Sequence, residues 1–170
     1  MTSRLIPIAL VLGVGCNEFF HALFDLYGYE YKVMLVGWVI SMDKTAASAD
    51  AWRGIDSPIA AYVAYAAIWC THAVGGVVAL AGAYRLIRTA PQDNAGMKKA
   101  YALAEAGIGI AAALYLVGFI AIASGWFLMH TAPTPPNFLA NAQLLFISYM
   151  AVLIYLQSKK GSEPFSMKVL

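Results

Sequence analysis

Three ionisable side chains lie close together in an otherwise apolar stretch near the start of the chain. Glu18, His21 and Asp25 are spaced i, i+3 and i+7, so they share one face of a helix. Glutamate, histidine and aspartate side chains together can bind iron, copper or zinc. Ionisable groups are costly inside a membrane and face a protein interior or water there. We expect His130 to reach a similar depth and to complete a candidate metal site.

A second candidate is His72, which lies inside a long apolar run. Small residues follow it at helical spacing, namely Gly75, Gly76, Ala79 and Ala83. Such a stripe lets two helices approach closely, and a polar side chain within it can form a hydrogen bond to the neighbouring helix. Helix packing is therefore the first interpretation of His72. The functional alternative is a contact with a bound haem, pigment, quinone or lipid.

A b-type haem between His21 and His72 would need both histidines at one depth, because two axial ligands meet one iron from opposite faces. By helical rise, His72 lies about 21 Å from the outer end of its span, and His21 only about 6 Å from the outer end of its own. A haem between His21 and His72 is therefore the weaker interpretation, and a pair of His21 and His130 matches better in depth but lies near the surface. No bound cofactor is the first expectation for the chain, and a contact with haem, metal, quinone or pigment is the alternative.

The predicted metal site carries no established catalytic pattern. Di-metal sites in helix bundles use two Glu-x-x-His pairs, and this sequence contains one, from Glu18 to His21. The sequence has no phosphate-binding glycine loop, nucleophile elbow or metalloprotease motif. Three interpretations stay open: a polar contact that links helices, a contact with a partner, and metal or proton chemistry.

Helices long enough to cross a membrane must position these residues. The chain has 170 residues, of which 61% are hydrophobic and 12% charged. Soluble domains carry about 25% charged residues, and a membrane-spanning helix needs about 20 mostly apolar ones. We therefore predict an all-α membrane protein with one domain over residues 1–170, folded as a four-helix bundle. The predicted spans are residues 5–24, 58–87, 101–130 and 137–157.

Basic residues predict the orientation of the bundle, because Lys and Arg gather on the cytoplasmic side. One side has eight of them, and the loop 25–57 has three, diluted by five acidic residues. We expect both termini in the cytoplasm and the loop 25–57 outside. Residues 31–42 of that loop are apolar but too short to span, which favours a helix that lies on the membrane surface or packs on a partner. The eight are Arg4, Arg85, Arg88, Lys98, Lys99, Lys159, Lys160 and Lys168, and the three are Lys32, Lys44 and Arg53.

Four short motifs occur in order along the chain. They are Ser41-Met42-Asp43-Lys44-Thr45, Trp52-Arg53-Gly54-Ile55-Asp56-Ser57-Pro58, Gly82-Ala83-Tyr84-Arg85-Leu86 and Gly125-Trp126-Phe127-Leu128-Met129. On these motifs the chain resembles the bacterial "predicted small integral membrane proteins", a domain of unknown function, over residues 17–157. The resemblance implies a four-span protein of the bacterial inner membrane, and it implies no activity.

Two functions from different classes follow from these observations. The first is a non-catalytic accessory subunit of a larger respiratory or photosynthetic membrane complex, which contacts lipid and other membrane subunits. The second is an independent membrane protein that binds a metal or cofactor, or moves a small solute, through Glu18, His21, Asp25 and His130. A nucleic-acid partner is not expected, because the net charge is only +2 and no basic cluster with interleaved aromatic residues occurs.

Overall fold

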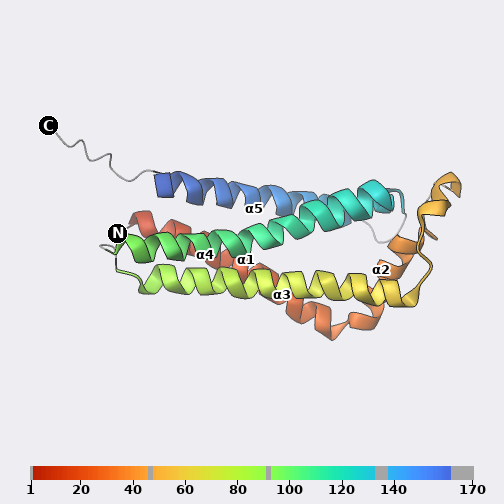
Figure 1. The fold of residues 1–170 in the computed structure, drawn as a ribbon, viewed down its shortest axis with the longest axis horizontal. Coiled ribbons are helices and arrows are strands. Elements are labelled where there is room, and N and C mark those ends of the chain that lie inside the picture. Colours follow the sequence, from red (N-terminus) through yellow and green to blue (C-terminus); the bar gives the residue numbers. More distant parts are fainter. Residues whose placement is uncertain (1, 46–47, 91–92, 133–137, 162–170) are drawn as a thin grey trace.

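The computed structural model describes residues 2–45, 48–90, 93–132 and 138–161, and all the regular structure in these ranges is helical. Four helical segments are long and apolar enough to cross a membrane, so the predicted four-span, all-α fold is confirmed (Figure 1). The elements in chain order are α1 (Thr2–Tyr27), α2 (Tyr29–Ser41), η1 (Ser48–Arg53), α3 (Pro58–Arg88), α4 (Asn94–Ala113), η2 (Leu114–Trp126), η3 (Met129–Thr131) and α5 (Phe138–Gly161).

Local sequence signals explain where the two central helices begin. The side chain of Ser57 accepts a hydrogen bond from the backbone N–H of Ala60 at the start of α3, and Pro58 occupies the first helical position. The side chain of Asp93 accepts one from the N–H of Gly96 at the start of α4, at 2.8 Å. Both helices therefore start at side chains that satisfy unpaired backbone donors.

Small residues let the central helices α3 and α4 pack backbone against backbone. A Cβ atom added at Gly107 would lie 2.3 Å from the backbone nitrogen of Ala79, and one added at Gly82 would lie 2.5 Å from that of Ala104. Neither distance leaves room for a larger residue. Close approach of this kind is how helices associate in membranes, where apolar side chains gain little by leaving lipid.

The segment after α4 continues as η2, a π-helix with wider turns. Its last hydrogen bond runs from the N–H of Phe127 to the carbonyl of Ile122, five residues earlier, at 3.1 Å. Leu128 then adopts a left-handed conformation with φ 53°, and the chain enters the short η3 turn. The third spanning segment therefore ends at Trp126, and His130 lies beyond it rather than inside a span that reaches residue 130.

The two ends of the bundle differ in how far the helices extend. We call the end with the start of α1, the end of α3 and the start of α4 the basic end, and the opposite one the α2 end (Figure 1). At the α2 end, α1 stops short of the start of α3, and α2 packs along the extra length of α3. A second small core, which includes Val33, Ile40, Tyr65 and Phe127, fills this junction.

The segment 25–57, predicted as an outer loop, contains the last residues of α1, helix α2 and the short helix η1, and η1 contacts the end of η2. The indole of Trp52 meets that of Trp126 edge to face at 6.2 Å between ring centroids. The guanidinium of Arg53 lies 5.7 Å from the ring of Trp126 and forms an ion pair of 3.1 Å with Asp50. These contacts attach η1 to the third spanning segment.

Candidate functional site

Glu18 is the centre of a polar cluster in the interior of the bundle. Its side chain is completely buried, with an exposed fraction of 0%. Its Oε2 shares a hydrogen bond of 2.7 Å with His72 Nδ1. Its Oε1 accepts hydrogen bonds from the hydroxyls of Tyr149 at 2.6 Å and Tyr115 at 3.1 Å. We call these four residues the Glu18 cluster, and each of them comes from a different spanning segment.

The close approach of α1 and α3 explains how Glu18 reaches His72. A Cβ atom added at Gly76 would lie 2.8 Å from the backbone nitrogen of Phe19 and 3.2 Å from the Cβ of Glu18. Because Gly76 lacks that atom, the two backbones touch at this position. His72 lies one helical turn before Gly76 on the same face of α3, which places its ring against the carboxylate.

Other polar and aromatic side chains surround the carboxylate. Asn17 donates a hydrogen bond to the hydroxyl of Tyr149 at 2.7 Å. The ring of Tyr115 meets His72 edge to face at 5.9 Å and Tyr149 edge to face at 5.7 Å. In the described chain, every polar side-chain atom of Glu18 has a hydrogen-bond partner. A buried polar network with satisfied members specifies one arrangement of the elements that supply them.

The His21 and His72 rings stack, with 5.2 Å between centroids and 21° between planes. The expected difference in depth between these residues is therefore wrong. The two depths were counted from the end of α1 and from the start of α3, and these two helix ends lie at different positions along the axis of the bundle (Figure 1). Stacked rings present faces to each other, so the pair does not direct two nitrogens at one iron.

Asp25 belongs to a separate set of contacts at the end of α1. Its carboxylate forms an ion pair with Lys32 of α2, and its backbone carbonyl accepts a hydrogen bond from the hydroxyl of Tyr65. One turn earlier, the carbonyl of Ala22 accepts a bond of 3.0 Å from Trp69 Nε1. Two side chains of α3 thus hold the last turns of α1 in place.

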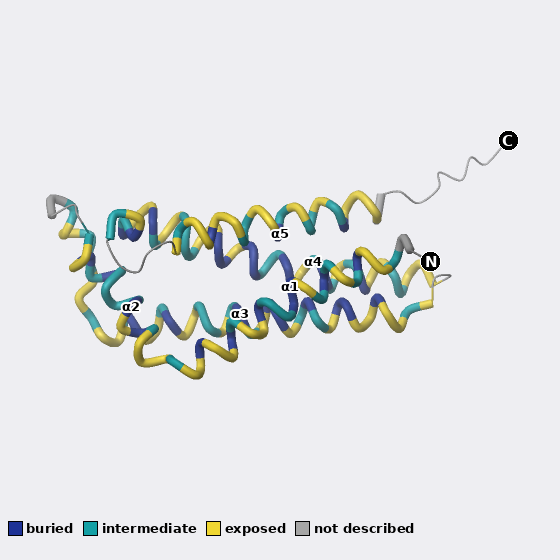
Figure 2. The backbone as a smooth tube through the Cα atoms, turned by 180° about the vertical axis from the view of Figure 1, so that it is seen from behind, coloured by how far each residue is buried: buried dark blue, intermediate teal, exposed yellow. Residues whose placement is uncertain are grey.

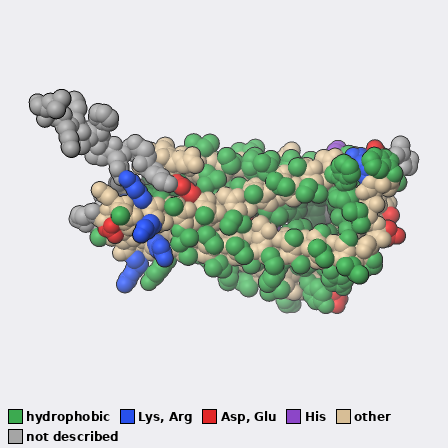
Figure 3. Space-filling view, viewed as in Figure 1, with side chains coloured by type: hydrophobic (Ala, Val, Ile, Leu, Met, Phe, Trp, Pro, Cys, Tyr) green, Lys and Arg blue, Asp and Glu red, His purple; other side chains and the backbone are tan. Residues whose placement is uncertain are grey.

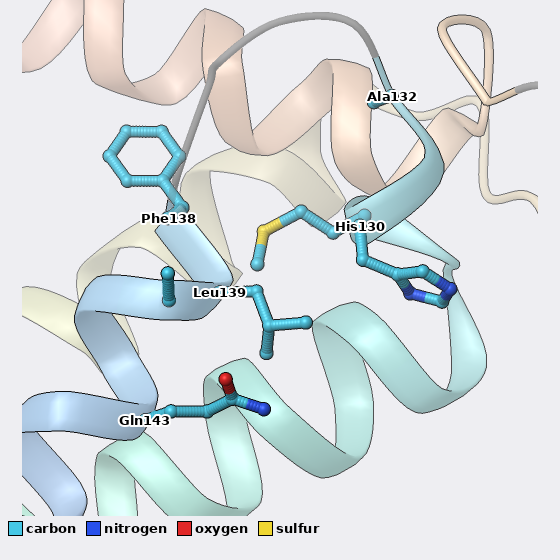
Figure 4. A pocket seen from close by; sticks show the side chains of 7 residues that line it. His130, Ala132, Phe138, Leu139 and Gln143 are labelled. Atoms are coloured by element: carbon cyan, nitrogen blue, oxygen red, sulfur yellow. The ribbon is translucent and has the colours of Figure 1, made fainter.

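His130, the fourth residue of the predicted metal site, is exposed and lies in η3. It lines a cavity of about 250 Å³ together with Met129, Leu139 and Gln143, among others (Figure 4). Within the described ranges, no three His, Cys, Asp or Glu side chains form a group that could hold a metal ion. The structure brings Glu18 and His21 to the same region but does not bring Glu18, His21, Asp25 and His130 together.

Sequence reasoning missed Tyr115 and Tyr149 as members of this site. A signal for the tyrosines was present, because both lie well inside spanning segments, away from the interface where tyrosines gather. A tyrosine at such a depth needs a hydrogen-bond partner for its hydroxyl. The apolar runs around the two tyrosines therefore indicated a buried acceptor, and Glu18 is that acceptor.

A family model described as "Predicted small integral membrane protein (DUF2165)" matches residues 3–159. No curated protein and no solved structure matches the chain.

Proposed function

The chain belongs to the family of predicted small integral membrane proteins, and from this premise we propose that it is a non-catalytic accessory subunit of a larger membrane complex. In this role the Glu18 cluster holds four helices in one arrangement, and the outer surface of that arrangement contacts the partner. The polar centre contributes to the fold of the subunit and performs no reaction.

One observation supports this proposal above the others: the Glu18 carboxylate is fully buried, and both of its oxygens are hydrogen bonded to partners inside the chain. A catalytic or transport residue must reach its substrate, and the Glu18 side chain has no exposed area. His72 is hydrogen bonded to one oxygen, and two tyrosines donate to the other. The arrangement is that of a polar link between helices.

The exposed apolar surface of the spanning helices can contact both lipid and a partner subunit. No more than a third of the most apolar window of any candidate span is buried inside the protein, and in α5 the share is 17%. Helices α1 and α3 expose large apolar side chains, including Phe24, Tyr27 and Val63. Exposed positions recur along the backbone of both helices (Figure 2). A partner helix can pack on such faces without opening the interior.

Native purification from the source membrane in mild detergent tests the proposal. The tagged chain should migrate with other membrane subunits in a defined ratio, measured by mass spectrometry of the same peak. Migration of the chain by itself, under conditions that keep a reference respiratory complex intact, would contradict the accessory role. An absorption spectrum of the peak distinguishes a colourless subunit from a haem or pigment protein.

The second candidate function is proton handling by an independent membrane protein. The observation that favours it is a row of three titratable side chains, in which the ring of His21 stacks on that of His72 and His72 is hydrogen bonded to Glu18. Ionisable groups in a span are candidates for proton relays by default. Reconstituted vesicles with a pH-sensitive dye inside discriminate the two functions, since only the second predicts proton uptake that disappears in Glu18→Gln.

We further propose that the basic end faces the bacterial cytoplasm, with both termini on that side of the inner membrane. The support is the positive charge around the junction of α3 and α4, where Arg88 is the last residue of α3 and Lys98 and Lys99 lie near the start of α4. Reporter fusions at the C-terminus test this orientation. A cytoplasmic fluorescent reporter should be active there, and an active periplasmic phosphatase fusion would contradict the proposal.

A further inference from the structure

Exposed basic side chains gather at the end of α3 and the start of α4, where Lys and Arg form a group on the surface (Figure 3). Arg85 and Arg88 lie in the last turn of α3, three residues apart, and both are exposed. Lys99 is exposed in the second turn of α4. From this surface we propose a binding site for the headgroup phosphate of an anionic phospholipid, with Arg85 and Arg88 as its main ligands.

Capping of the helix end does not account for Arg85 and Arg88, because Arg4 performs that task. Its Nη2 donates hydrogen bonds to the carbonyls of Leu86 at 2.9 Å and Thr89 at 2.8 Å. It also approaches the sulfur of Met97 at 3.4 Å. Arg4 therefore orders the junction between α3 and α4, and the side chains of Arg85 and Arg88 are exposed there.

The position of Lys99 near the start of α4 is not explained by the helix dipole. A helix N-terminus favours negative charge, so Lys99 gains nothing from its position near the start of α4. The nearby carboxylate of Asp93 already bonds the N–H of Gly96 as a helix cap. The basic charge at this end thus exceeds what the helices themselves require, and an external anion complements it.

The surface next to the arginines identifies a phospholipid rather than free phosphate as the ligand. Val77, Ala81, Tyr84 and Arg88 recur at i, i+4, i+7 and i+11, so they form one exposed stripe along α3. Tyr84 is 61% exposed and Val77 is 55% exposed. An acyl chain can lie along this apolar stripe while its phosphate reaches Arg88 and Arg85. Arginine suits this role because its planar fork matches phosphate oxygens in pairs.

Native mass spectrometry of the full chain, released from nanodiscs with equal amounts of phosphatidylglycerol and phosphatidylcholine, tests the proposal. The wild type should retain more phosphatidylglycerol than phosphatidylcholine. The double variant Arg85→Gln with Arg88→Gln should reduce the ratio of the two bound lipids about tenfold. Arg85→Lys with Arg88→Lys should keep part of it, since charge remains but the paired geometry is lost. Lys44→Gln, which removes one charge at the α2 end, is the control and should change nothing.

Three results would overturn the site. The first is a wild type without preference for phosphatidylglycerol, and the second is an equal preference in the double Gln variant. The third is loss of the bound lipid in millimolar inorganic phosphate at constant ionic strength, which would reduce the surface to a general anion site. Far-UV circular dichroism of each variant confirms that the helices are intact, so a loss of binding reports on the arginines themselves.

Discussion

Removal of the Glu18 side chain should destabilise the whole bundle. In Glu18→Ala, His72, Tyr115 and Tyr149 each lose a buried hydrogen-bond partner, and a cavity replaces a side chain with no exposed area. Because the three partners belong to three other spanning segments, the effect should appear as a loss of cooperative stability rather than as local fraying.

The structure gives the size of this effect. Hydrogen bonds between helices in a membrane contribute about 0.6 kcal/mol on average and up to about 1.7 kcal/mol each. Three of them, at 2.6, 2.7 and 3.1 Å, therefore predict a decrease of about 2 to 5 kcal/mol in the free energy of unfolding. Glu18→Gln keeps an acceptor for the tyrosines, so we expect a smaller decrease of about 1 kcal/mol.

Unfolding in mixed micelles, with increasing dodecyl sulfate and circular dichroism as the signal, measures these differences. The matched control is Glu30→Ala on α2, an exposed glutamate, which should change stability by no more than about 0.5 kcal/mol. A double-mutant cycle with Tyr149→Phe should give a coupling energy above about 0.5 kcal/mol. If Glu18→Ala unfolds together with the Glu30 control, the cluster does not hold the helices and the reasoning fails.

Two further predictions concern packing. Gly107→Ala should separate α3 from α4 and abolish cooperative unfolding in the same micelles, because the added Cβ would lie 2.3 Å from the backbone nitrogen of Ala79. Gly109→Ala on the same helix is the control. A Cβ added there has no atom within 4 Å, so this variant should unfold as the wild type does. Trp126→Ala removes the ring that contacts Trp52 and Arg53. We therefore expect η1 to become sensitive to limited proteolysis while the helical content stays unchanged. Equal cleavage rates in the variant and the wild type would show that these ring contacts do not attach η1.

The sequence was sufficient to predict the four spanning helices because the length of an apolar run is a local property. It was also sufficient to place Glu18 and His21 on one helical face, because residues three positions apart are neighbours on a helix surface. The partners of Glu18 were beyond its reach, because they lie 54, 97 and 131 residues away along the chain. No spacing rule connects residues on different spans, and only the assembled bundle brings them together.

Two predictions about depth in the membrane were wrong because a residue's distance from the end of its own helix does not give its position in the bundle. His21 and His72 stack although their distances from their own helix ends differ, because α3 extends past the end of α1 at the α2 end (Figure 1). His130 lies outside the third span because the left-handed turn at Leu128 follows its end. The apolar run continues from Trp126 through Met129, so composition contained no sign of that turn.

The central claim is that the Glu18 cluster links helices and performs no chemistry. The most direct test compares wild type and Glu18→Gln in the source membrane, at a temperature where both are folded. The amount of the proposed complex and its respiratory or photosynthetic activity per assembled complex are measured together. Equal activity per complex is the predicted result. A complex that assembles normally but loses its activity in Glu18→Gln would contradict the claim and would assign the carboxylate to proton transfer.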